Sequence, residues 1–355
     1  MKLCLDTNKC YAIALEGGGA KGAYHIGVWQ ALEEAGIRYC AVAGTSVGAL
    51  NGAMMCMRDM EMALDIWSNI RLSDVIAVDE QDEEELHRLF SGEAGFSDLR
   101  ELLPRVLEVI RNRGLDIGPL RAWVQKLADP RRIRESDVDF FVTTVSLTDR
   151  KAMDVHINAL PEEEIGNMLL ASAYHPSFRQ EPLGGKHYAD GGLVDSLPLY
   201  PLVQRGYKDI IGVRIPVMGR ERRFRVPEDV NITIIDTDSD LGGILNFDAR
   251  QSRRNLKIGY YDAKRVLYGL YGRNYYIDRS LSEEEALRAL TARYRREGES
   301  LRRLYEKELP RISRRLDAGK DDYYALFLAC LERQAEEKGL ERLCIYRDTE
   351  LMESI

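Results

Sequence analysis

The stretch CYAIALEGGGAKGAYHIGVWQAL, residues 10–32, contains the pattern that decides the fold. Residues 10–16 form a short apolar run, which is typical of a buried β-strand. Four glycines follow within residues 17–22, and residues 21–35 then carry apolar side chains at helical spacing before Gly36. The stretch therefore predicts a strand, a glycine-rich loop and a helix. Such a loop binds either a phosphate or an oxyanion.

The glycine-rich loop satisfies only half of each nucleotide-binding motif. Gly17, Gly19 and Gly22 fit the pattern G-x-G-x-x-G. A dinucleotide site also needs an acidic residue about 20 positions later, and none occurs over residues 38–57. A P-loop requires Gly-Lys-Ser/Thr, whereas Lys21 is followed by another glycine. An oxyanion hole needs only free backbone N–H groups, which the first three glycines of the loop supply.

A second motif follows the next predicted strand. Residues 38–44 are expected to form this strand and residues 47–57 a helix, so GTSVG at 44–48 lies at a sharp turn between them. In that context G-x-S-x-G presents a nucleophilic serine, here Ser46, at a helix N-terminus. The N–H groups of the helix favour negative charge that develops beside the serine.

A serine hydroxyl needs a base that takes its proton. The order Ser–acid–His of α/β-hydrolases permits Ser46 with an aspartate such as Asp154 and with His187, the last histidine of the chain. The other candidate is Asp190 in ADGGLVDSLP, where the two glycines predict a tight turn. A carboxylate with a pKa near 4 is a weak base, so this second arrangement requires burial that raises the pKa.

The rest of the chain predicts an α/β fold with a mostly parallel central sheet flanked by helices. Strands and helices alternate at the start of the chain, and strand character returns between residues 139 and 236. A helical insertion is expected over about 60–135, including an apolar-striped helix at 97–114 that packs into the core or covers the site. We expect one domain over 1–247 and a charged, helical C-terminal lobe over 248–355.

The composition of the chain limits the classes of molecule that it is expected to bind. The 355 residues carry a net charge of −8, so nucleic acid is not expected and any membrane contact is local and transient. Neither a signal peptide nor an apolar run of about 18 residues is found. The six cysteines lack zinc-like spacing, which indicates reduced thiols, no metal site and a cytoplasmic protein. The oligomeric state stays open.

Three blocks of sequence resemble the patatin-like phospholipases, a family of lipid acyl hydrolases. They are EGGGAKG at 16–22, GTSVG at 44–48 and DGG at 190–192, in the order found in the family. The segment ASAYHP at 171–176 resembles the family too, and the likeness covers roughly residues 10–215. Three ordered blocks on compatible elements are far more specific than any one of them.

The resemblance implies a three-layer fold and a Ser–Asp dyad without histidine, with Ser46 as nucleophile and Asp190 as general base. It implies release of free fatty acid from phospholipids or other lipids, without a metal or organic cofactor. Lys21 stands where the family often has Arg, and Glu16 where it often has Asp. The expected oxyanion hole comprises Gly17, Gly18, Gly19 and Val47, with Lys21, Gly44, Gly48, Gly191 and Gly192 in support. The alternatives are a short-chain carboxylesterase, a thioesterase and a non-catalytic lipid-binding protein.

Overall fold

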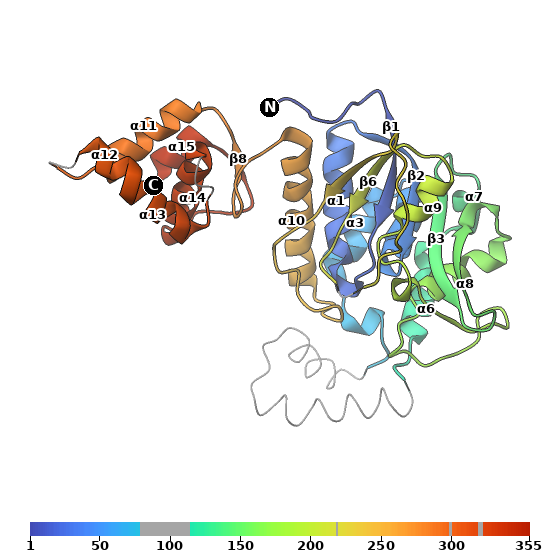
Figure 1. Ribbon diagram of the computed structural model, residues 1–355. Coiled ribbons are helices and arrows are strands. Elements are labelled where there is room, and N and C mark those ends of the chain that lie inside the picture. Colours follow the sequence, from blue (N-terminus) through green and yellow to red (C-terminus); the bar gives the residue numbers. More distant parts are fainter. Residues whose placement is uncertain (79–113, 218, 298–299, 319–321) are drawn as a thin grey trace. The chain divides into compact units, whose positions relative to one another are not determined.

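A computed structural model of the chain describes two compact units. The described residues are 1–78, 114–217, 219–297, 300–318 and 322–355, so all of the helix expected over 97–114 except its last residue lies outside them. The larger unit is Leu5–Ala263, and the smaller unit joins Met1–Cys4 to Lys264–Ile355 (Figure 1).

The two units divide at 263/264, later in the chain than the expected boundary at 247/248, and the next helix belongs mostly to the larger unit. This helix, α10 (Ala249–Tyr268), packs against α1 (Ala23–Glu34) through glycines on both sides. A Cβ added to Gly27 would lie 1.9 Å from the carbonyl oxygen of Leu256, and the backbones therefore touch. This contact brings the N-terminal part of α10 into the larger unit.

The larger unit is built on a seven-stranded sheet, in which β4, β3, β2, β1, β6 and β7 follow one another and β5 also pairs with β3. The strands β1, β2, β3, β6 and β7 are parallel, whereas β4 and β5 run antiparallel to β3. The predicted mostly parallel sheet is thus confirmed. The bounds of the seven strands are β1 Cys10–Leu15, β2 Arg38–Thr45, β3 Asp139–Ser146, β4 Lys151–His156, β5 Tyr188–Asp190, β6 Asp209–Val213 and β7 Asn231–Ile235.

Helices cover both faces of this sheet and give the predicted three layers. Neighbouring phenylalanines of β3 serve opposite faces, as the two-residue period of a strand requires. Phe141 packs with the alanines of β1 and β2 and with α9 (Leu199–Gln204). Phe140 meets α2 (Val47–Cys56), where a Cβ on Gly52 would lie 2.6 Å from its ring. Further α-helices in the described part of the unit are α3 Met60–Asn69, α6 Gly118–Leu127, α7 Pro130–Arg134 and α8 Glu162–Ser172.

Strands β2 and β5 meet end to end along one edge of β3. Thr45, the last residue of β2, pairs with Thr143 of β3, and Asp190, the last residue of β5, pairs with Thr144. Because β4 occupies the opposite edge of β3, β2 and β5 lie on the same edge and run toward each other. Two segments that are far apart in the sequence therefore end at the same place.

The smaller unit is mostly helical, as predicted, around a core of Leu290, Leu304, Phe327, Leu331 and Leu351. It also contains a parallel two-stranded sheet that the sequence pattern did not predict. Its elements are β8 Tyr276–Asp278, α11 Glu283–Tyr294, α12 Leu301–Arg303, a π-helix at Leu304–Glu308, α13 Leu309–Leu316, α14 Tyr323–Glu337, β9 Ile345–Arg347 and α15 Asp348–Ser354.

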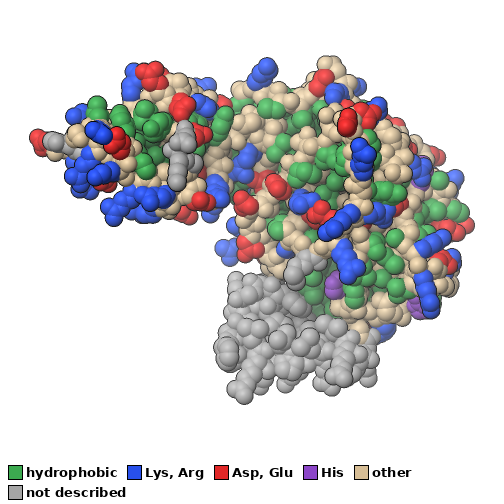
Figure 2. All heavy atoms as spheres, viewed as in Figure 1, with side chains coloured by type: hydrophobic (Ala, Val, Ile, Leu, Met, Phe, Trp, Pro, Cys, Tyr) green, Lys and Arg blue, Asp and Glu red, His purple; other side chains and the backbone are tan. Residues whose placement is uncertain are grey.

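Charged side chains of both signs are interspersed over the visible face of the larger unit (Figure 2). None of the helices in the described ranges combines the length and the apolar character that a bilayer crossing requires.

Candidate active site

Ser46 occupies a strained turn between β2 and α2. Its φ of 55° and ψ of −125° are unusual for a residue with a side chain. The flanking glycines make the turn possible, because a Cβ on Gly44 would lie 2.2 Å from Gly48 O, and one on Gly48 would lie 2.3 Å from Leu15 O. The segment GTSVG thus has the strand-to-helix geometry that exposes a serine hydroxyl.

Ser172, at the end of α8, holds this turn in place. Its Oγ accepts a hydrogen bond from Ser46 N at 2.9 Å and donates one to Thr143 O at 2.7 Å. Thr143 is the partner of the last residue of β2, so the hydroxyl continues the sheet's hydrogen bonding where β2 turns away. The Ser172 side chain is fully buried, which keeps water from competing for these bonds.

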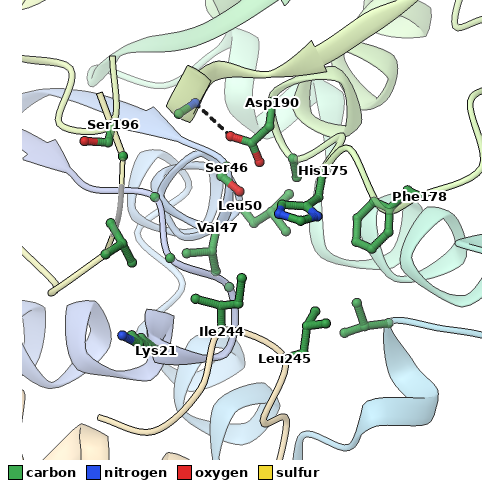
Figure 3. Close-up of a pocket in the computed structure, with 18 of the residues that line it drawn as sticks. Lys21, Ser46, Val47, Leu50, His175, Phe178, Asp190, Ser196, Ile244 and Leu245 are labelled. Atoms are coloured by element: carbon green, nitrogen blue, oxygen red, sulfur yellow. Dashed lines mark hydrogen bonds between the residues drawn. The ribbon is translucent and has the colours of Figure 1, made fainter. Parts of the chain in front are cut away.

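Asp190 faces Ser46 from the end of β5, and the two side chains point toward one another (Figure 3). The carboxyl group is buried, with 7% of the residue exposed, and its Oδ1 accepts a hydrogen bond from Gly192 N at 2.8 Å. Burial raises the pKa of Asp190 to about 6, while the Ser46 hydroxyl and the Gly192 N–H stabilise the charged form and limit the rise. A Cβ on Gly191 would lie 2.2 Å from Thr143 O, so this turn requires glycine.

The glycine loop beside Ser46 offers fewer free amides than predicted. Gly17 N donates to Ser196 O at 2.9 Å, so this amide is already used and does not fit the oxyanion role. Gly19 and Val47 begin a 3-10 turn and α2, positions at which N–H groups have no partner within the helix. Across the described part of the chain, no acceptor binds the N–H of Gly18, Gly19 or Val47. These three amides remain free for an anion.

Glu16 and Lys21 fasten the two ends of the glycine loop. Glu16 is buried and accepts hydrogen bonds from Ser196 Oγ at 3.2 Å and from Ile215 N at 2.7 Å. Burial raises the pKa of Glu16 to about 7. Lys21 Nζ donates to Pro216 O, and the side chain extends away from the strained turn in Figure 3. The cation therefore anchors the loop rather than facing the serine.

The alternative arrangement with a histidine base is not formed. His187 is exposed, and neither it nor Asp154 lines the cavity that contains Ser46. Asp154 instead accepts hydrogen bonds from Arg222 Nη1 at 2.6 Å and from Thr143 Oγ1 at 2.8 Å. Within the described ranges, no three His, Cys, Asp or Glu side chains are grouped as metal ligands.

Ser46 and Asp190 line a cavity of about 910 Å³, a volume within the range of ligand-binding sites. Its walls combine the glycine loop with side chains from α2, α6 and the segment after β7. Most of these side chains are apolar, among them Leu50, Trp123, Phe178, Ile244, Leu245 and Phe247.

The sequence pattern does not predict the roles of Ser172, His175 and residues 243–247 at this site. Ser172 and His175 lie within ASAYHP, a segment that pointed to a family but to no role. Residues 243–247 follow the last strand without any motif, at the edge of the predicted catalytic domain. Ser172 reaches Ser46 N, and His175 and the segment after β7 reach the cavity, through contacts between segments that are remote in sequence. Periodicity does not detect such contacts.

Residues 13–203, more than half of the chain, match the patatin-like phospholipase family. Lysophospholipase NTE1 of Mycosarcoma maydis is 29% identical over 204 residues, which make up 57% of this chain and 9% of that protein. Patatin-like phospholipase domain-containing protein 7 of Rattus norvegicus is 24% identical over 209 residues, 59% of this chain and 14% of that protein. This chain thus corresponds to only a small part of the length of these relatives.

A likeness to a solved structure extends over nearly the whole chain. VipD from Legionella pneumophila aligns over 97% of this chain and 86% of its own, with a TM-score of 0.42 and 15% identity. The family match itself includes the glycine loop, the strained turn at Ser46 and the turn that begins at Asp190. The chain belongs to the patatin-like phospholipase family.

Proposed function

We propose that the protein is a serine acyl hydrolase that cleaves fatty acyl esters of lipids, with Ser46 as nucleophile and Asp190 as general base. The observation that carries this proposal is a serine in a strained turn facing a buried carboxyl group, on the wall of an apolar cavity. With a pKa of about 6, Asp190 is mostly ionised at neutral pH and is a stronger base than an exposed aspartate.

The reaction proceeds through an acyl-enzyme. Asp190 takes the hydroxyl proton as Ser46 Oγ attacks the ester carbonyl carbon, and the oxyanion is bound by the free N–H groups of Gly18, Gly19 and Val47. These donors are already oriented, so they need not reorganise as the charge develops. The alcohol leaves with the proton from Asp190. Water then attacks the acyl group with Asp190 again as base, which releases the fatty acid and restores the serine.

A lipid substrate is supported by the cavity and by the relatives. Apolar walls bury an acyl chain with a gain of about 0.8 kcal/mol per methylene, and one matched relative is a lysophospholipase by name. Two of the side chains that line the cavity, Leu193 and Ile244, are 45% and 40% exposed. We expect them to contact the surface of a micelle or membrane while the chain enters.

The release of free fatty acid from phospholipid and lysophospholipid micelles tests the proposal. Ser46→Ala should abolish release, and Asp190→Asn should lower it at least about 100-fold because the general base is lost. His187→Ala is the matched control, since this exposed residue lies outside the cavity and should keep wild-type activity. Retained activity in a folded Ser46 or Asp190 variant would overturn the assignment.

A series of acyl chain lengths separates the proposed enzyme from its alternatives. We expect kcat/KM for p-nitrophenyl esters to rise with chain length, because each added methylene is buried against the apolar walls. A maximum at acetyl or butyryl esters would favour a short-chain carboxylesterase. Absence of all turnover and of labelling by a fluorophosphonate would favour a binding protein.

A further inference from the structure

His175 carries a hydrogen-bond donor that the proposed dyad does not use. Ser177 N donates to His175 Nδ1 at 3.3 Å, and Ser177 Oγ lies 2.8 Å from the same atom. A ring nitrogen that accepts a backbone N–H carries no proton, so in the neutral ring the proton resides on Nε2. Burial lowers the pKa of His175 below its usual 6.5, which keeps the ring neutral at pH 7.

The ring is fixed beside the nucleophile. His175 and Ser46 line the same cavity, and Figure 3 shows the imidazole between Ser46 and Phe178. The Phe178 ring packs edge-on against it, with the ring centroids 5.8 Å apart. Ser196, whose carbonyl binds the glycine loop, lies on the other side of Ser46. Among the described residues, no group binds His175 Nε2, which leaves its N–H to a ligand.

The chemistry of a lipid ester determines which part of the substrate can use this donor. The carbonyl oxygen is taken by the free amides of the glycine loop and Val47, and the rest of a fatty acyl chain has no acceptor. The alcohol portion contributes the bridging oxygen, which every ester shares, and in a glycerol ester it adds hydroxyl oxygens as further acceptors. An apolar alcohol would strip water from the His175 N–H without replacing the hydrogen bond, and this loss disfavours its binding.

We propose that His175 Nε2–H forms a leaving-group subsite that binds a hydroxyl oxygen of a glycerol-type alcohol. This inference rests on the proposed acyl hydrolase function. It makes His175 a residue that determines specificity, whereas Ser46 and Asp190 carry out the bond cleavage.

The test compares two esters that differ only in the hydroxyl groups of the alcohol, monolauroylglycerol and propyl laurate, in identical mixed micelles. We expect His175→Phe to lower the ratio of kcat/KM for the glyceryl ester to that for the propyl ester about three- to tenfold, the usual effect of one hydrogen bond. His175→Gln retains an N–H donor at a similar reach and should keep most of the wild-type ratio. Fluorophosphonate labelling of Ser46 in each variant checks that the variant is folded and that its nucleophile is reactive.

The outcomes distinguish the subsite from the function on which it rests. If His175→Phe lowers kcat/KM equally for both esters, or for neither, the ratio is unchanged. This result would overturn the subsite while the wild-type protein remains an active hydrolase. A ratio that falls equally in His175→Gln would also contradict the role of the donor. Wild-type protein that hydrolyses neither ester and is not labelled would overturn the hydrolase function itself, and the subsite with it.

Discussion

Asp190 illustrates how a single buried side chain can set the working pH. Burial raises the pKa of Asp190 to about 6, and only the ionised carboxylate can take the proton of Ser46. We therefore predict that kcat/KM on a soluble ester rises with pH through a midpoint near 6, so that activity at pH 5 is about one tenth of the plateau. Circular dichroism over the same range controls for unfolding. A flat profile between pH 5 and 8 would contradict the role of Asp190.

Ser172 tests whether the strained turn at Ser46 needs its side-chain acceptor. Ser172→Ala removes the acceptor of Ser46 N and should lower kcat about tenfold or more, because the turn loses a hydrogen bond that holds its unusual backbone. The matched control is Ser136→Ala, which removes a hydroxyl that likewise links Cys56 O to Val138 N but lies away from the cavity.

Both serine variants should lose about 1 kcal/mol in the free energy of unfolding, measured in urea. Only Ser172→Ala should lose catalytic rate at saturating ester. If the two variants have the same kcat, the hydrogen bond to Ser46 N contributes to folding alone.

Among the secondary-structure elements, two glycines have different roles. One allows two backbone segments to approach closely, whereas the other only adds flexibility to a helix. Gly191 lies where a Cβ would be 2.2 Å from Thr143 O, whereas Gly166 within α8 has no atom within 4 Å of such a Cβ. Gly166→Ala should raise the free energy of unfolding by up to about 1 kcal/mol, the usual gain in a helix interior. Gly191→Ala should abolish activity and destabilise the fold. Thermal unfolding checks both, and a stable, active Gly191→Ala would contradict the tight junction of β5 and β3.

Local pattern predicts most elements but not the contacts that assemble the site. The first two strands and helices follow from apolar runs and glycine punctuation, and the structure forms them within a residue or two of the predicted bounds. The meeting of Ser46 with Asp190 depends on β5 pairing with β3 next to the end of β2, a long-range register that no local period encodes. The DGG motif and the family resemblance could point to it, whereas the residue pattern alone left His187 open.

Two other features depend on long-range contacts in the same way. The loop taken alone predicts a free N–H at Gly17, yet this N–H donates to the carbonyl of Ser196, which lies beyond β5 in the sequence. The change in composition predicts a boundary at 247/248, whereas the two units divide at 263/264 because the backbone of α10 packs against α1 at Gly27. In both cases a partner distant in sequence decides the outcome.

At the scale of the whole molecule, the chain consists of two compact units, each with its own core. In the smaller unit, the buried Glu332 accepts hydrogen bonds through Oε1 from the N–H groups of Arg273, Asn274 and Tyr275 at 2.7–2.9 Å. Glu332→Ala leaves these amides without an acceptor and should destabilise this unit by at least about 2 kcal/mol. Hydrogen exchange should accelerate at the three amides.

Glu332→Gln is the matched variant, since its amide oxygen can still accept these hydrogen bonds and should preserve most of the stability. Fluorophosphonate labelling of Ser46 should persist in both variants, because every described residue that lines the cavity belongs to the larger unit. Loss of labelling in Glu332→Ala would show that the larger unit does not hold its site without the smaller one.

The proposed mechanism requires that Ser46 is a nucleophile activated by Asp190, and fluorophosphonate labelling followed by peptide mass spectrometry examines both residues at once. We predict one adduct, on the peptide containing Ser46, and a labelling rate at pH 7.5 that falls at least about 100-fold in Asp190→Asn. An adduct on a different residue, or labelling of Asp190→Asn at the wild-type rate, would contradict this mechanism.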